Sequence, residues 1–170
     1  MLYLLDANVV ITANNSYYRI DAVPEFWAWV AYHGNHGTIK MPLETFEEVK
    51  DGSKDDAQDP PFGWIQSNKG ALVLDEDVDP DLVQQVLVNG YAMDLTDEGL
   101  EQIGRDPFLI AYVLASPADR CVVTTEVSSP KKQRQNRRIP DVSATLGVTC
   151  CNTFEMLSEL NFSTSWKAEK

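Results

Sequence analysis

The sequence predicts an α/β protein in which a central, mostly parallel β-sheet lies between two layers of helices. Short apolar segments typical of buried strands recur along the chain, and longer segments with helical signals separate them. Because parallel strands need crossover connections, this alternation predicts a three-layer α/β/α domain. The 170 residues contain no internal repeat, and we assign residues 1–160 to one domain and 161–170 to a C-terminal tail.

Five apolar segments are predicted to be strands. Leu2–Leu5 is the first, and it ends on a carboxylate at Asp6. Residues 121–125 are rich in β-branched side chains and end at Glu126, as expected of a buried strand. The other three predicted strands are residues 38–41, 71–74 and 147–150.

The helical segments are recognised by apolar periodicity, by proline at the first position or by a capping residue. They are residues 24–32, residues 42–49 ending near Gly52, residues 81–89, 96–103 and 106–115, and a last helix that Thr153 caps. In residues 106–115 we expect Asp106 at the cap and Pro107 at the first helical position. Residues 54–61 are predicted to form a polar loop.

Composition excludes several classes of protein. Apolar residues make up 44% of the chain and charged residues 24%, which is typical of a globular domain. No segment approaches the roughly 18 apolar residues of a membrane helix, and the first residues lack the basic region of a secretory signal. We therefore expect a cytoplasmic protein without membrane contact. Cys121, Cys150 and Cys151 lack zinc-type spacing and are expected to be reduced, structural residues.

Four acids stand out by position. Asp6 and Glu126 follow predicted strands, Asp106 begins a helix, and Glu48 lies on an early helix. Ligands of open α/β sheets bind beyond the carboxyl ends of the strands, where these side chains can converge. Carboxylates repel one another without a cation, whereas Mg²⁺ and Mn²⁺ prefer such hard oxygen ligands together with substrate phosphate. The pattern favours a divalent metal site that activates water for phosphodiester cleavage.

Each acid also has a structural interpretation. Asp106 can be a simple helix cap, Glu48 can belong to a solvated helix face, and Glu126 can be a surface charge after a strand. Asp6 is the hardest to explain in this way, because an unpaired carboxylate is rarely left inside an apolar segment. The joint appearance of the four favours the metal site.

The order of these motifs resembles the PIN-domain ribonucleases, many of which are toxins of bacterial toxin–antitoxin pairs. The motifs are Leu-Leu-Asp6-Ala-Asn8, Glu48-Val49, Asp106-Pro-Phe-Leu-Ile-Ala and Val-Val-Thr124-Thr125-Glu126. The segments Tyr17-Tyr18, Pro24-Glu-Phe-Trp27 and Arg138-Ile139-Pro140-Asp141-Val142 are most similar to a PIN-like branch of largely uncharacterised proteins. The resemblance extends from Leu2 to about Leu157.

The resemblance implies that Asp6, Glu48 and Asp106 bind Mg²⁺ or Mn²⁺. It also implies that Asn8 helps to orient Asp6. Glu47 precedes Glu48, and we choose Glu48 because a hydrophobic residue follows it, as in the family.

The fourth acid departs from the family pattern. Most members have aspartate where this chain has Glu126, whose longer side chain would reach the metal directly or through water. Asp141 is a rival for this place, since Ile-Pro-Asp-Val can return the chain to the crevice. The resemblance makes Thr124 a polar group behind the ligands.

The net charge of −12 argues against a nucleic-acid-binding protein, but its distribution is uneven. Five cations lie within eight positions after the predicted strand at 121–125, and we call this segment the basic loop: Lys131, Lys132, Arg134, Arg137 and Arg138. Such a loop beside an acidic site suits an RNA backbone. A solvated loop or a site for an acidic partner protein is the alternative.

The acids predict metal-dependent cleavage of a phosphodiester, and the resemblance implies that the protein is an endoribonuclease with an RNA substrate. The resemblance adds a toxin function, an antitoxin partner and a possible homodimer. One alternative is a degenerate PIN-like module that binds RNA or protein without cleavage, which Glu126 in place of aspartate favours. An aspartate-nucleophile phosphohydrolase is a further alternative, but it usually needs a second acid where Asn8 stands.

Overall fold

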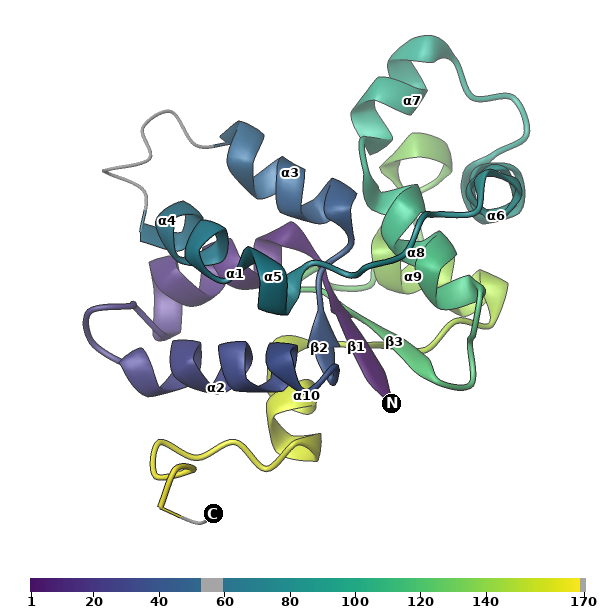
Figure 1. The fold of residues 1–170 in the computed structure, drawn as a ribbon. Helices are drawn as coiled ribbons and strands as arrows, with labels where there is room; N and C mark the ends of the chain where they lie inside the picture. Colours follow the sequence, from purple (N-terminus) through teal and green to yellow (C-terminus); the bar gives the residue numbers. More distant parts are fainter. Residues whose placement is uncertain (53–59, 169–170) are drawn as a thin grey trace.

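The computed structural model describes residues 1–52 and 60–168, and a parallel sheet forms its centre (Figure 1). In the described residues the sheet has four strands in the spatial order β2-β1-β3-β4. They are β1 (Leu2–Leu5), β2 (Ile39–Lys40), β3 (Arg120–Val123) and β4 (Cys150–Cys151). Every pairing is parallel, which confirms the predicted α/β class and sheet.

Helices form the crossover connections between the strands. The α-helices are α1 (Ala7–Thr12), α2 (Pro24–Asn35), α3 (Leu43–Gly52), α4 (Pro60–Ser67), α5 (Lys69–Leu72), α6 (Pro80–Gln85), α7 (Asp97–Ile103), α8 (Asp106–Leu114), α9 (Ile139–Leu146) and α10 (Thr153–Glu159). Two π-helical segments, η1 (Ala13–Tyr17) and η2 (Val86–Tyr91), extend α1 and α6, and η3 (Arg134–Asn136) is a 3₁₀ turn. The predicted helices at 24–32, 42–49, 81–89 and 96–103 are confirmed by these elements.

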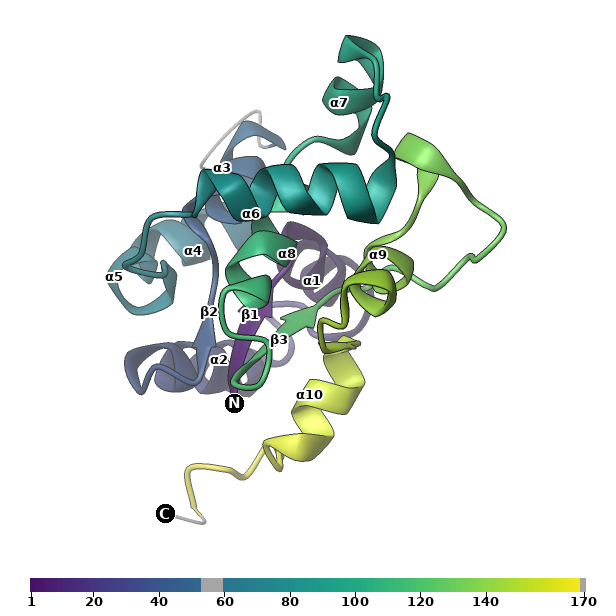
Figure 2. The ribbon, with the colours of Figure 1, turned by 90° about the vertical axis from the view of Figure 1, so that its right-hand side faces the viewer.

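Helices cover both faces of the sheet. Figure 1 shows α2 and α10 on one side of the strands and α8 and α9 on the other. Side chains alternate accordingly along β1: Tyr3 and Leu5 join the hydrophobic cluster that includes α2 and α10, and Leu4 joins the cluster that includes α8 and α9. The turned view in Figure 2 shows the long helix made by α6 and η2 crossing over α8. The predicted three-layer architecture is therefore confirmed.

Two predicted strands differ from the observed ones. Residues 71–74 do not form a strand: Ala71 and Leu72 end α5, and Val73 forms an isolated bridge to Met41. A short apolar run alone does not distinguish a buried strand from a buried helical turn. The last strand lies at Cys150–Cys151 instead of residues 147–150, because Gly147 adopts φ 70° and terminates α9.

Two predicted helix caps are displaced by one residue. Arg105 is the N-cap of α8, and Asp106 is the first helical residue. Asn152 caps α10 by accepting the backbone N–H of Glu155, whose side chain accepts the N–H of Asn152 in return. Thr153 is therefore the first helical residue of α10.

The predicted loop at 54–61 lies mostly outside the described residues, and its last two positions, Pro60 and Pro61, already belong to α4. The predicted tail after residue 160 begins too early. Trp166 is only 8% exposed and packs in the core, where its Nε1 donates to the carbonyl of Glu25 at 3.1 Å. Trp166 and the half-buried Phe162 thus attach residues 161–168 to the core, although most of these residues are exposed.

The cysteines are all unpaired in the structure. Cys150 and Cys151 face opposite sides of the sheet, as expected for neighbours on a strand. Among the described helices, none is both long enough and apolar enough to cross a membrane.

Candidate acidic site

The register of β1 and β3 brings Asp6 and Thr124 together. Leu5 pairs with Val123, so the next residue of each strand lies at the same edge of the sheet. Thr124 donates its hydroxyl to Asp6 Oδ2 at 2.7 Å, and both side chains are almost fully buried. Asp6 also caps α1, where its Oδ1 accepts the backbone N–H of Asn8 at 3.5 Å. Desolvation nevertheless raises the Asp6 pKa above its ordinary value, although these hydrogen bonds oppose it.

Glu48 reaches the same region from α3. Phe46 and Val49 anchor this helix in the core, each 3% exposed, and Glu48 lies half-buried beside the cleft. Glu47 is exposed, in agreement with the choice of Glu48 from the sequence. The pKa of Glu48 is raised by burial and then by the charge of Asp6.

Arg105 fixes α3 against the start of α8. Its guanidinium donates to the carbonyl oxygen of Glu44 at 3.0 Å and to Asp51 Oδ2 at 2.7 Å. Glu44, Glu48 and Asp51 are spaced by four and three residues, so they share one face of α3. The arginine thus holds the helix that carries Glu48 next to the helix that begins with Asp106.

Asp106 enters the site at the first turn of α8. Gly104 ends α7 with φ 64°, a conformation that favours glycine, and this sharp turn starts α8 one residue after Arg105. The pKa of Asp106 is raised to about 8, first by burial and then by the charges of Asp6, Glu126 and Glu48, and Arg138 partly offsets them. The pKa values of Asp6, Glu48 and Asp106 are thus all raised above their ordinary values.

A cleft of about 360 Å³ opens over these acids. Among the residues that line it are Asn8, Glu48, Asp51, Arg105, Asp106 and Glu126. Asp6 is buried and does not line the cleft, but it lies near enough for its charge to raise the pKa values of both Glu48 and Asp106. We call Asp6, Glu48 and Asp106 the acid cluster. These are three of the four acids for which the sequence predicted a common site.

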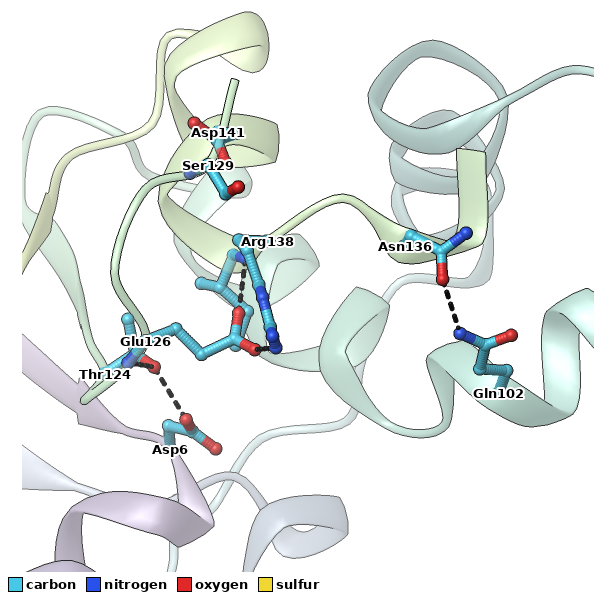
Figure 3. Close-up of polar contacts among 9 residues, drawn as sticks. Asp6, Gln102, Thr124, Glu126, Ser129, Asn136, Arg138 and Asp141 are labelled. Carbon is cyan, nitrogen blue, oxygen red and sulfur yellow. Dashed lines mark hydrogen bonds and ion pairs between the residues drawn. The ribbon is translucent and has the colours of Figure 1, made fainter. Parts of the chain in front are cut away.

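Glu126 lies within electrostatic reach of the acid cluster, but both its oxygens are occupied. Oε1 accepts from Arg138 Nη1 at 2.5 Å, and Oε2 accepts the backbone N–H of Ile139 at 2.7 Å (Figure 3). Ile139 is the first residue of α9, so Glu126 satisfies a free N–H at the start of that helix. The longer side chain at this position therefore ties the end of β3 to α9.

Asp141 does not join the acids. Its oxygens accept from the Ser128 hydroxyl at 2.5 Å and from the Ser129 backbone N–H at 2.7 Å. Figure 3 shows it directed toward Ser129 and well separated from Asp6. These hydrogen bonds lower its pKa, which is the opposite of the shift in the acid cluster. The structure thus does not support Asp141 as the rival of Glu126 for the fourth place, because Asp141 fixes the loop before α9 instead.

Only part of the basic loop is available to a ligand. Arg134 is bound to Asp94 at 2.6 Å, Arg137 donates to the carbonyl of Gly90, and Arg138 is paired with Glu126. Lys131 and Lys132 are exposed, and their side chains form no ion pair within the described residues. The three arginines of the basic loop thus hold the loop in place through contacts within the protein.

Two residues of the site had no clear signal in the sequence. Arg105 precedes Asp106 directly, but nothing in its neighbourhood revealed that it would bridge to α3. Tyr91, the last residue of η2, lies two positions beyond the predicted helix at 81–89, and its pKa is raised first by burial and then by the charge of Asp106.

The donor set fits a hard divalent cation. None of the three carboxyl groups forms an ion pair within the described residues, and the charges of Arg105 and Arg138 offset the raised pKa values of Glu48 and Asp106 only in part. Mg²⁺ or Mn²⁺ would remove the remaining repulsion. Within residues 1–52 and 60–168, no three His, Cys, Asp or Glu side chains already form a closed metal-binding group. The three carboxyl groups would therefore have to move closer together to share one ion.

Comparison with known proteins gives one match. A family described as a domain of unknown function (DUF4411) matches residues 3–164. No curated protein and no solved structure matches the chain.

Proposed function

The chain belongs to the DUF4411 family, and from its acid cluster we propose that it is a Mg²⁺- or Mn²⁺-dependent endoribonuclease. The observation that carries this proposal is that Glu48 and Asp106 line one cleft and that buried Asp6 lies near both, with all three pKa values raised. Acids held only in ion pairs would have lowered pKa values, whereas those of the cluster are raised, including that of Asp6 with its two hydrogen-bond donors. Perturbed acids in a cleft are characteristic of functional sites.

The residues around the cluster suit a phosphodiester substrate. A bound divalent cation would supply Lewis-acid activation of water and neutralisation of charge on the phosphate. Thr124 and the backbone N–H of Asn8 fix the carboxylate of Asp6. Lys131 and Lys132 offer unpaired positive charge for a neighbouring phosphate. The substrate class, RNA, rests on the resemblance of the motifs to PIN-domain ribonucleases.

Cleavage of a labelled RNA with Mg²⁺ or Mn²⁺ tests the proposal. Asp6→Asn and Asp106→Asn should each abolish cleavage, because each removes a charged ligand from the cluster. Asp97→Asn is the matched control: Asp97 is an exposed acid that also occupies the first position of a helix. Cleavage by the two cluster variants at the wild-type rate would refute the assignment.

A second candidate function is an RNA- or protein-binding module without catalysis. The commitment of both Glu126 oxygens to Arg138 and Ile139 favours it, because a fourth carboxylate is then withheld from the cluster. Calorimetric titration with Mn²⁺ discriminates between the two. If the protein is an enzyme, it should bind Mn²⁺, and Asp6→Asn should lose this binding. If it is a binding module, it should bind RNA in the presence of a chelator and should not bind Mn²⁺.

The resemblance also supports a biological setting for the proposed nuclease. We propose that it acts in the cytoplasm as the toxin of a toxin–antitoxin pair, with an antitoxin protein as its partner. Expression in a bacterial host tests this: the wild type should arrest growth, and Asp106→Asn should not. Size-exclusion chromatography of the purified chain tests the possible homodimer.

A further inference from the structure

Tyr91 is a buried tyrosine whose hydroxyl has no hydrogen-bond partner among the described residues. The side chain is 7% exposed, and its oxygen is completely shielded from solvent. The hydroxyl groups of Tyr3 and Tyr112 are also enclosed, but they donate to Glu159 and to the carbonyl of Glu76. A buried donor without a partner costs roughly 1–3 kcal/mol, so native proteins rarely retain one without a reason.

The backbone around Tyr91 is held firmly from two sides. Gly90 lies so close to α9 that a Cβ at this position would come within 2.6 Å of Val142 Cγ1. The guanidinium of Arg137 donates to the carbonyl of Gly90, which fixes the last turn of η2. π-Helical turns are uncommon and occur often at functional sites. The chain therefore uses a rare turn and a required glycine to place this ring.

The surroundings of the hydroxyl are charged. The carboxylate of Asp106 has the largest electrostatic effect on it, followed by Glu126, and Arg137 partly offsets them. The ring itself packs in the hydrophobic cluster that contains the α8 residues Leu109 and Ile110. The phenol thus stands between an apolar core and the start of the helix that carries Asp106.

We propose that Tyr91 is a positioning residue of the acid cluster, whose hydroxyl donates to the Asp106 carboxylate when a divalent cation occupies the site. This proposal rests on the proposed metal site. An ionised Asp106 has two carboxylate oxygens, and one bound cation does not use all of their lone pairs. The neutral hydroxyl of Tyr91 can therefore donate to the oxygen of Asp106 that does not bind the cation. Outer hydrogen bonds of this kind fix the direction of metal ligands and increase metal affinity.

The proposal predicts that Tyr91→Phe stabilises the metal-free protein but weakens its binding of Mn²⁺. In the metal-free protein the variant should melt roughly 2–4 °C higher, because a shielded donor without a partner is removed while the ring remains. In the presence of Mn²⁺ it should bind the ion roughly tenfold more weakly, because Asp106 loses its hydrogen bond. If the ring had only a structural role, Tyr91→Phe would not combine a higher melting temperature without metal with a weaker affinity for Mn²⁺.

Tyr112→Phe is the matched control. It removes a hydroxyl that already has a partner, so the metal-free protein should melt at a lower temperature while Mn²⁺ affinity stays unchanged. Both variants and the wild type are titrated with Mn²⁺ by calorimetry and melted in a chelator.

The outcomes separate this proposal from the proposed function. Wild-type and Tyr91→Phe proteins with equal Mn²⁺ affinity would overturn the role of Tyr91 and leave the metal site intact. A lower melting temperature of metal-free Tyr91→Phe would also overturn it, because the hydroxyl would then already be satisfied. A wild type that binds no Mn²⁺ would remove the metal site and this proposal together.

Discussion

Asp106→Asn provides a quantitative test of the acid cluster in the absence of metal. The folded protein holds the Asp106 pKa at about 8, against an ordinary value of 3.8 for an aspartate in the unfolded chain. Between these two values the unfolded chain releases the proton and the folded protein keeps it. The free energy of unfolding should therefore fall as pH rises from about 4 to about 8, and the contribution is fully lost above 8.

The size of this effect follows from the pKa difference. Each pKa unit is worth about 1.36 kcal/mol, so a difference of roughly four units gives roughly 5 kcal/mol as an upper limit. Asp106 is partly exposed at the cleft, and solvent screening reduces this value. We expect about 2 kcal/mol in practice. Asparagine does not ionise, so the variant should escape this loss and exceed the wild type in stability at pH 9.

Urea unfolding with a chelator at pH 5 and pH 9 measures the effect. Asp97→Asn serves again as the control, since it removes a charge from the start of a helix outside the site. Saturating Mn²⁺ at pH 9 should reverse the order by stabilising the wild type alone, by about 4 kcal/mol at a thousand times its Kd. If the wild type and Asp106→Asn lose the same free energy of unfolding between pH 5 and pH 9, the pKa of Asp106 is not raised in the folded protein and the reasoning is refuted.

Three further changes probe neighbouring parts of the site. Glu126→Gln should lower the free energy of unfolding by about 1 kcal/mol in urea, because it breaks an ion pair, and should reduce Mn²⁺ affinity much less than Asp6→Asn does. Thr124→Val should weaken Mn²⁺ binding roughly tenfold in calorimetry, since Asp6 loses the hydroxyl that orients it. Replacement of Lys131 and Lys132 by glutamine should reduce the slope of log RNA affinity against log salt by about 2. An unchanged slope would show that the lysines do not contact phosphate.

The fold was largely predictable because local patterns determine it. Leu2–Leu5 is a short apolar segment closed by a carboxylate, and the alternation of strands with proline-started helices leaves few arrangements other than a parallel sheet. The errors occur where local signals are ambiguous. Residues 71–74 have the composition of a strand, but α5 buries Leu72 in a helical turn. Gly147 was counted in a strand, although its φ of 70° ends a helix.

The candidate site was predictable in its members and not in its contacts. Asp6, Glu48 and Asp106 follow strands or occupy helices whose ends meet, and they lie near one another in the structure, while their role as ligands stays a prediction. The partners of charged side chains depend on which loops approach them in space. For that reason Asp141 was expected in the site but binds Ser129, and Arg138 was expected to face RNA but holds Glu126.

The sequence by itself determined the three-layer architecture and the residues that enter the acid cluster, because apolar periodicity and element ends are local properties of the chain. Only the tertiary structure decided which charges remain free. Packing of α9 against the end of β3 occupies Glu126, and packing of η2 against α8 and α9 leaves Tyr91 with an unused donor near Asp106. Hydrogen bonds and ion pairs act over a few ångströms, so contacts between residues far apart in sequence appear only when the fold has brought them together.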